Sequence, residues 1–188
     1  FGEPTSHPRF IDMLRIAKEA GLKVGVTTNG TLLDEEMCEQ LVALRLDRLV
    51  VSIDGTQPEH YQDIRLGSHL NEVIANMQRL RRVKIRRASR FAPPQVGIAF
   101  VAMRRNIEDL PELPDLALRI GATEIIVSNL IPYSRDMESE ILYEDTLTMR
   151  PQRTSPQRLN LSLPRMDINA QTLPPFAQVM NSHLSIGF

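Results

Sequence analysis

The residues best suited to bind a ligand in this sequence are short polar or glycine-containing segments that each follow a predicted or implied strand. In parallel α/β folds, ligands bind at the carboxyl ends of strands, because the loops and helix N-termini there converge on one face. Asn-Gly and Asp-Gly pairs also form ordinary turns, yet they recur here at the same end of successive strands. This recurrence favours a binding site built by residues 2–5, 27–30, 52–55 and 129–132.

Side chains that could carry acid–base, nucleophilic or metal chemistry are sparse. Neither His7 nor His60 has an acidic residue at a sequence spacing that would indicate a His–carboxylate pair, so neither is assigned as a general acid or base. Cys38 shares a predicted helix face with Met37 and Leu41, where a small buried thiol is the expected role. The sequence therefore predicts a binding function and assigns no catalytic residue and no metal ligand to this chain.

The hydrophobic pattern predicts the elements that position these segments. Strands alternating with helices of about ten to fifteen residues imply right-handed βαβ units and a parallel sheet covered by helices, which is an α/β fold. Ser6 and Asn106 are expected to cap the first and last helices, and Gly21 and Gly121 to end them. The predicted helices cover 6–21, 34–45, 68–80 and 106–120, and the predicted strands cover 23–28, 47–53, 95–103 and 123–130.

Composition and charge are those of an ordinary soluble globular protein. Of 188 residues, 42% are hydrophobic and 24% are charged, and the formal net charge is -1. These values exclude disordered, fibrous and membrane-spanning classes and disfavour nucleic acid as a partner. A single cysteine forms no intrachain disulfide, so a cytoplasmic setting is expected. Most charges lie in residues 1–150, for which we predict a core domain, and we predict a Pro-rich extended C-terminal appendage over 151–188.

The densest run of charge is basic and covers residues 79–90. Basic residues complement the dipole at a helix C-terminus, but the preceding helix is predicted to end near Leu80, so most of the run is expected to be a solvated connector. An acidic stretch over 136–145 is a candidate partner for it. The run also supports an alternative function, a non-catalytic α/β module that docks a partner or nucleic acid through residues 79–90. A dinucleotide-binding domain is weaker, because no glycine-rich fingerprint follows any strand.

Four features, taken in order along the chain, carry a resemblance to a known family. They are Gly2-Glu3-Pro4-Thr5 with His7-Pro8, Thr28-Asn29-Gly30-Thr31-Leu32-Leu33, Val51-Ser52-Ile53-Asp54-Gly55, and Arg65. Together they resemble the core of radical S-adenosylmethionine (radical SAM) enzymes, and among those the peptide- and cofactor-modifying members of SPASM type that carry additional iron–sulfur clusters. The resemblance extends over residues 1–135 and implies a partial parallel (β/α) barrel, an incomplete (β/α)6 radical SAM core.

The resemblance also implies which residues bind S-adenosylmethionine. The backbone of Gly2 and Glu3 would meet the methionyl amino group, and glycine permits a close approach. The hydroxyl of Ser52 and the carboxylate of Asp54 suit the ribose hydroxyls, and the guanidinium of Arg65 suits the methionyl carboxylate. The remaining implied contacts are Thr28 and Asn29, near the amino acid and ribose, and Leu130, near the adenine.

The same resemblance implies a [4Fe–4S] cluster that reduces S-adenosylmethionine and releases a 5′-deoxyadenosyl radical, which abstracts hydrogen from a substrate. Three thiolates hold such a cluster so that one iron stays open to the cofactor, and the family's three-cysteine loop would precede Gly2. The chain holds one cysteine, Cys38. We therefore expect the chain to start within the domain, to bind S-adenosylmethionine without ligating the cluster, and to be inactive as it stands. The sequence identifies no particular small-molecule or peptide substrate.

Overall fold

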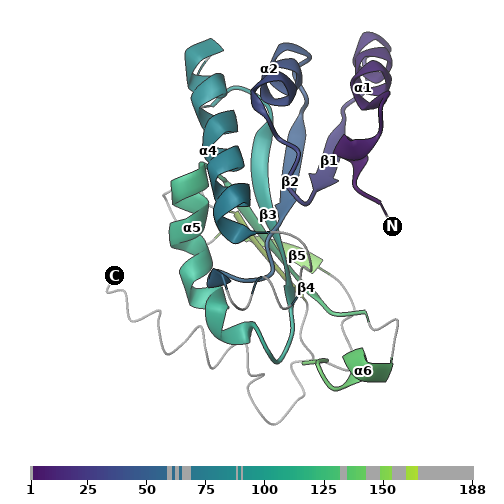
Figure 1. Cartoon of the computed structure of the whole chain (residues 1–188). Helices are drawn as coiled ribbons and strands as arrows, with labels where there is room; N and C mark the ends of the chain where they lie inside the picture. The colour runs from purple at the N-terminus through teal and green to yellow at the C-terminus, as the bar shows by residue number, and fades with distance from the viewer. Residues whose placement is uncertain are drawn as a thin grey trace.

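A six-stranded sheet runs through the centre of the molecule (Figure 1). The strands are β1 (Gly25–Thr28), β2 (Arg48–Ser52), β3 (Gln95–Ala102), β4 (Glu124–Asn129), β5 (Met149–Arg153) and β6 (Asn160–Pro164). Their order is β1-β2-β3-β4-β6-β5, in which β1 to β4 and β6 are parallel and β5 is antiparallel to β6. The computed structural model describes residues 2–58, 61, 64, 69–87, 89, 91–131, 135–142, 149–153 and 160–164.

Helices alternate with the parallel strands and cover one face of the sheet. They are η1 (Pro4–Ser6), α1 (Phe10–Glu19), α2 (Glu35–Ala43), α4 (Leu70–Arg87), η2 (Ile107–Glu112), α5 (Leu113–Ile120) and α6 (Arg135–Glu138), where η denotes a 3-10 helix. The long helix α4 contacts both α2 and α5 (Figure 1). Among the described helices, none has the length and apolar character needed to cross a bilayer.

The two faces of the sheet differ because successive side chains of a strand point to opposite sides. In β3, Val96, Ile98 and Phe100 are buried in a core that they share with residues of the helices. The alternate residues Ala99 and Val101 are half-buried. The core therefore lies between the sheet and its helices, and the opposite face of β3 presents small side chains.

An ion pair crosses that opposite face at the amino ends of the strands. The Arg48 guanidinium donates from Nη2 to Glu124 Oε2 at 2.6 Å and from Nε to the same oxygen at 3.0 Å. Gly97 lies between the two residues in the sheet, because β3 separates β2 from β4. A Cβ atom at Gly97 would lie 3.3 Å from Glu124 Oε2, so a side chain there would crowd the pair.

The prediction that Ser6 caps the first helix is wrong. The α-helix begins at Phe10, with Arg9 in the capping position and no side-chain cap. Ser6 ends η1 instead, and its hydroxyl donates to the carbonyl of Glu3 at 2.7 Å. The chain needs this short turn because the segment before α1 bends toward the end of β1. The predicted stop at Gly21 is confirmed by its positive φ of 75° directly after the helix.

The two later helices also differ from expectation. α4 continues to Arg87 rather than ending near Leu80, so most of the basic run is helical. The helix predicted over 106–120 is divided into η2 and α5, and prolines at 111 and 114 explain the division because they lack the N–H that an α-helix uses. Gly121 ends α5 in the left-handed region with φ 77°, as predicted.

The boundary predicted at residue 150 falls within a strand. β5 begins at Met149, and β6, within the segment predicted as an appendage, pairs in parallel with β4. The sequence of β6, Asn160–Pro164, alternates leucine with polar residues up to Leu163, a pattern typical of a strand. Strands after residue 150 thus extend the same sheet, and the division into a core and an appendage stays a prediction.

Lys84 is a buried cation in α4. Its side chain is 5% exposed, and Nζ donates to the carbonyl of Pro94 at 2.6 Å. Burial disfavours the charged ammonium and lowers the pKa of Lys84 to about 8. Because the pKa in the unfolded chain is near 10.5, the unfolded state binds more protons between these two values, and stability rises with pH across that window.

Replacing Lys84 with Met should therefore stabilise the protein at neutral pH by about 1 to 3 kcal/mol, because the cost of burying a charge disappears while the aliphatic volume stays. The advantage of K84M over wild type should shrink as the pH rises from about 8 to 10.5. Urea unfolding of K84M and wild type between neutral pH and about pH 10.5 measures the difference in their free energies of unfolding. An advantage that does not change with pH would contradict the assigned cause.

Candidate functional site

The carboxyl ends of the parallel strands lie along one edge of the sheet. Thr28, at the end of β1, pairs with Val51, and Ser52, at the end of β2, pairs with Ala99 of β3. Asn129, at the end of β4, pairs with Ala102. The segments predicted to bind a ligand after β1, β2 and β4 therefore lie along the same edge.

Glu3 brings the N-terminal segment to this edge. Its Oε2 accepts from the backbone N–H of Asn29 at 2.7 Å, and its Oε1 accepts from the Thr28 hydroxyl at 2.7 Å. Oε1 also accepts from the N–H and hydroxyl of Thr5, at 3.1 and 2.6 Å. Burial raises the pKa of Glu3, but the hydrogen bonds from Asn29, Thr5 and Thr28 outweigh it, and its pKa lies below the ordinary value. The Glu3 side chain is thus a clamp between the N-terminal segment and the end of β1. Because the Glu3 carbonyl is bonded by Ser6, the backbone of Gly2 is the part of this segment left to face a ligand.

The turn after β1 is held by its own polar side chains. Thr28 is 2% exposed, and its hydroxyl accepts from the N–H of Gly30 at 3.0 Å. The Asn29 side chain accepts from the N–H and hydroxyl of Thr31, at 2.9 and 2.8 Å. Gly30 has φ 78°, and a Cβ there would lie 2.9 Å from Val73 Cγ1, so glycine is required on both counts. The Asn-Gly pair therefore does form a turn, and that turn sits at the candidate site.

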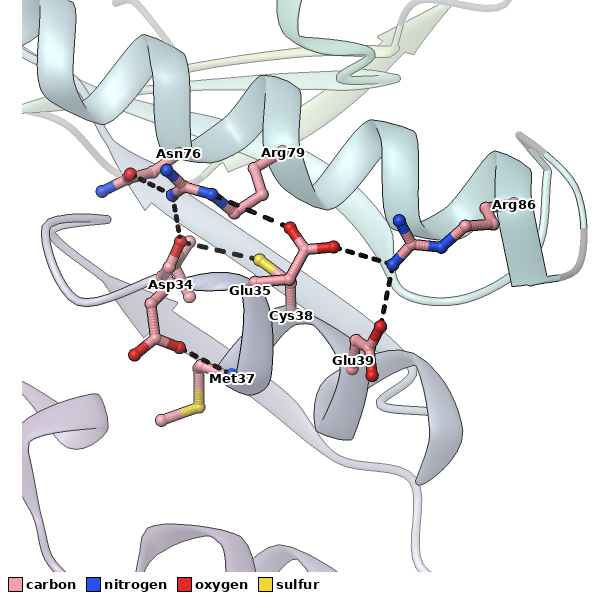
Figure 2. Close-up of polar contacts among 9 residues, drawn as sticks. Asp34, Glu35, Met37, Cys38, Glu39, Asn76, Arg79 and Arg86 are labelled. Carbon is pink, nitrogen blue, oxygen red and sulfur yellow. Dashed lines mark hydrogen bonds and ion pairs between the residues drawn. The ribbon is translucent and has the colours of Figure 1, made fainter.

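Helix α4 supports this turn through Asn76 and Arg79, which Figure 2 shows bonded to each other on that helix. Asn76 donates from Nδ2 to the carbonyls of Gly30 and Thr31, at 2.9 and 3.0 Å. Arg79 donates from Nη1 to the carbonyl of Leu33 at 2.8 Å and to Asn76 Oδ1 at 2.5 Å. Backbone carbonyls of the turn are thus bound by two side chains of one helix.

The segment after β2 has a similar support. Asp54 is 3% exposed, and its Oδ1 accepts from the N–H of Val101 in β3 at 2.8 Å. Asn106 donates from Nδ2 to the carbonyl of Asp54 at 2.9 Å. Further along, Thr56 donates its N–H to Asp109 Oδ2 at 2.9 Å and its hydroxyl to Glu112 Oε2 at 2.7 Å. The loop after β2 is therefore fixed to β3 and η2.

Several predicted site residues are thus used by the protein itself. Glu3, Thr28, Asn29 and Asp54 make hydrogen bonds that hold the edge together. Their predicted contacts with S-adenosylmethionine stay predictions.

Fewer of the predicted site residues have groups that make no hydrogen bond within the protein. Within the described part of the chain, the hydroxyl of Ser52 and the backbone of exposed Gly2 make no hydrogen bond. Leu130 is 8% exposed and directly follows β4. Arg65, the predicted carboxylate partner, lies outside the described residues. A small glycine, a free hydroxyl and an apolar side chain along one edge fit a ligand with both polar and apolar parts, such as S-adenosylmethionine.

Sequence reasoning missed Asn76 and Asp109, and it placed Asn106 at a helix start without its role at the site. Asn106 occupies the capping position of η2, as predicted, but its side chain makes no cap bond and reaches back to the loop after β2 and to β3 instead. The available signal for Asn76 was a polar residue within the predicted apolar face of its helix, beside Met77. The bonding partners of such residues lie far away in sequence, so the pattern alone does not reveal them.

Cys38 is a buried thiol, as predicted. It is 0% exposed, and its sulfur lies 3.7 Å from the carbonyl of Leu33 (Figure 2). Burial disfavours the thiolate and raises the pKa of Cys38 to about 12. The described residues contain no group of three side chains that could hold a metal ion. With a single cysteine, these 188 residues do not fit a [4Fe–4S] cluster, which needs three thiolates.

The basic run is largely satisfied within the protein. On α4, Arg86 pairs with Glu35 and Glu39 of α2, at 2.7 and 2.8 Å, and Arg87 pairs with Glu39 at 2.7 Å. Of the predicted acidic partner over 136–145, Glu140 pairs with Arg105, outside the basic run, at 2.9 Å, and residues 143–145 lie outside the described residues. The described part of the run up to Arg87 is therefore helical and largely paired rather than a connector, and the alternative of a docking module is not favoured.

The comparisons with known proteins agree with this geometry. The family model of the radical SAM superfamily matches residues 1–117. Over 150 residues the chain is 37% identical to the tungsten-containing aldehyde ferredoxin oxidoreductase cofactor-modifying protein of Pyrococcus furiosus, covering 80% of this chain and 42% of the relative. Over 140 residues it is 33% identical to the AdoMet-dependent heme synthase of Methanosarcina barkeri, covering 74% of this chain and 38% of the relative. The chain belongs to the radical SAM superfamily, whose enzymes use S-adenosylmethionine and a [4Fe–4S] cluster.

The structural comparison gives the fold. Streptococcus suis SuiB bound to S-adenosylmethionine matches with a TM-score of 0.58 at 20% identity, covering 70% of this chain and 29% of that chain. The predicted α/β class with a partial parallel barrel is thus confirmed. The chain spans less than half the length of the curated relatives above, at 42% and 38%.

Replacing Glu3 with Gln should lower the free energy of unfolding at neutral pH by about 1 to 2 kcal/mol, because an amide NH2 then faces groups that are themselves donors. The lowered folded-state pKa means that the stabilisation from the carboxylate is complete above about pH 4.5 and is lost as the pH falls through the folded value. E3Q should therefore lose less stability in acid than wild type does. Chemical unfolding at neutral pH and in acid, below the pKa of Glu3, tests this prediction. The control is the exposed Glu108→Gln, which should change neither the stability at neutral pH nor its loss in acid.

Proposed function

We propose that this chain provides the S-adenosylmethionine-binding edge of a radical SAM enzyme, and that the cysteines for its [4Fe–4S] cluster lie outside these 188 residues. The observation that carries the proposal is the Glu3 clamp, which joins the N-terminal segment to the end of β1 through bonds of 2.7 Å to Thr28 and Asn29. The clamp brings the backbone of Gly2 to the edge where Ser52 also lies.

Each open group has a proposed part of the cofactor to bind. The backbone carbonyl of Gly2 suits the methionyl amino group, because carbonyl oxygens accept from an ammonium. The Glu3 carbonyl already accepts from the N–H and the hydroxyl of Ser6, at 3.1 and 2.7 Å, so its part is to hold the segment. The unpaired hydroxyl of Ser52 can bond a ribose hydroxyl or the methionyl carboxylate. Leu130 offers an apolar surface at the end of β4, where an adenine ring would pack.

Two further residues of the predicted set have supporting roles in this proposal. Asp54 has one carboxylate oxygen bonded to Val101, so its part is to orient the segment around Ser52. Asn29 uses its side chain to close the turn and its N–H to bond Glu3, so its part is to fix the turn after β1. Arg65 is proposed as the carboxylate partner on the strength of its guanidinium.

The chemistry proposed for the whole enzyme is that of its family. S-adenosylmethionine, when bound and reduced, supplies the radical that removes hydrogen from a substrate. The part of this chain in that chemistry is to hold the cofactor in a fixed orientation. A cofactor that is already oriented has less freedom to lose on the way to the transition state, so the entropic cost of the reaction is smaller. Its helix-packed sheet is well suited to this role, because rigid strands present the binding segments.

Replacing Ser52 with Ala should weaken S-adenosylmethionine binding by about tenfold, which corresponds to the loss of one hydrogen bond. The measurement is calorimetric titration of the full-length, cluster-reconstituted protein, together with cofactor cleavage to methionine and 5′-deoxyadenosine under reducing conditions. Ser89→Ala, in the segment that precedes the amino end of β3, is the matched control and should bind as wild type does. Wild-type protein that neither binds nor cleaves the cofactor would refute the proposed function, whereas unchanged binding by S52A would remove only Ser52.

A further inference from the structure

Two buried asparagines lie directly behind the candidate site. Asn76, in α4, is 6% exposed, and Asn106, just before η2, is 0% exposed. A buried amide is costly unless its donors and acceptor are all bonded. Both side chains meet this condition, and both do so with the backbone of a loop that follows a strand.

Asn106 closes a ring of bonds around Asp54. Its Nδ2 donates to the carbonyls of Asp54 and Val101, both at 2.9 Å, and its Oδ1 accepts from the N–H of Met103 at 2.7 Å. The Asp54 carboxylate in turn accepts from the N–H of Val101. One amide therefore ties the end of β2 to the end of β3, next to Ser52.

Asn76 has the same role at the turn after β1. Both hydrogens of its amide bond loop carbonyls, those of Gly30 and Thr31. Its Oδ1 accepts from Arg79, which also bonds Leu33. The front of that turn carries the bond between Asn29 and Glu3, so Asn76 holds the loop on the side away from the candidate site.

We propose that Asn76 and Asn106 are positioning residues that pre-organise the two loops for S-adenosylmethionine, by bridging pairs of backbone carbonyls through their amide NH2 groups. Asn76 bridges two carbonyls of one loop, and Asn106 bridges a carbonyl of the other loop to one of β3. The inference rests on the proposed function. An apolar side chain would fill either position in a core at no cost in polar burial, but it would take away the donor that each pair of carbonyls shares. The loops would then be free to move, and ligand binding would have to order them.

This role predicts where the effect of a mutation appears. Ordering a loop opposes binding, so a loosened loop raises the dissociation constant for the cofactor. Once the cofactor is bound, the loop is again in place, so cleavage at saturating cofactor changes much less. A split between KM and kcat therefore separates positioning from a general loss of folded protein.

The test uses the isosteric variants N106D and N76D in the full-length, cluster-reconstituted protein. Each replaces a bridging NH2 with an oxygen that repels the two carbonyls. We expect the dissociation constant for S-adenosylmethionine, measured by calorimetry, to rise about tenfold or more in each. Cleavage at saturating cofactor should stay within about threefold of wild type. Exposed Asn71→Asp on the same helix is the matched control and should leave both values within about twofold.

Two further variants keep the test decisive. Ile120→Val in the core of α5 lowers stability without touching either loop, so it shows what destabilisation alone does to binding. If N76D does not fold, Arg79→Gln removes the donor to Leu33 and Asn76 from a partly exposed position, and binding should weaken about threefold. Asparagine variants that bind as tightly as I120V would overturn the inference. Wild-type protein that binds no cofactor would instead refute the proposed function.

Discussion

The Glu3 carboxylate is the interaction on which the candidate site depends. It accepts hydrogen bonds from two segments that are distant in the chain, the turn Pro4–Ser6 and the end of β1. A carboxylate is suited to this task because its two oxygens together accept several donors. Without it, the backbone of Gly2 would have no fixed relation to the strand ends, and the first of the binding segments would not be part of the edge.

Most polar groups at this edge form hydrogen bonds within the protein and are not available to a ligand. Thr28, Asn29 and Asp54 all bond neighbouring backbone, and the buried asparagines bond the same loops from behind. Such a network holds each loop in one conformation, because every buried donor and acceptor has its partner. The open groups, such as the hydroxyl of Ser52, are then presented by a rigid frame, which favours binding over reordering.

The charge on α4 illustrates how packing changes the meaning of a sequence feature. A basic run without acids suggests a surface for an anionic partner. In the folded chain, α2 lies beside α4 and supplies Glu35 and Glu39, which both pair with Arg86 (Figure 2). Glu39 also pairs with Arg87. The run therefore contributes to helix–helix contact, although exposed pairs of this kind add little stability each.

The sequence by itself determined the alternation of strands and helices, the stops at Gly21 and Gly121, the burial of Cys38 and the polar segments that follow β1, β2 and β4, because these depend on local periodicity and turn chemistry. Only the tertiary structure decided that Ser6 bonds Glu3 rather than capping a helix, that α4 runs on to Arg87, and that Asn106 reaches back to Asp54. Those outcomes depend on partners that strand pairing and helix packing bring close together. A side chain bonds the donor or acceptor that is nearest in space, and a local sequence pattern does not show which group that is.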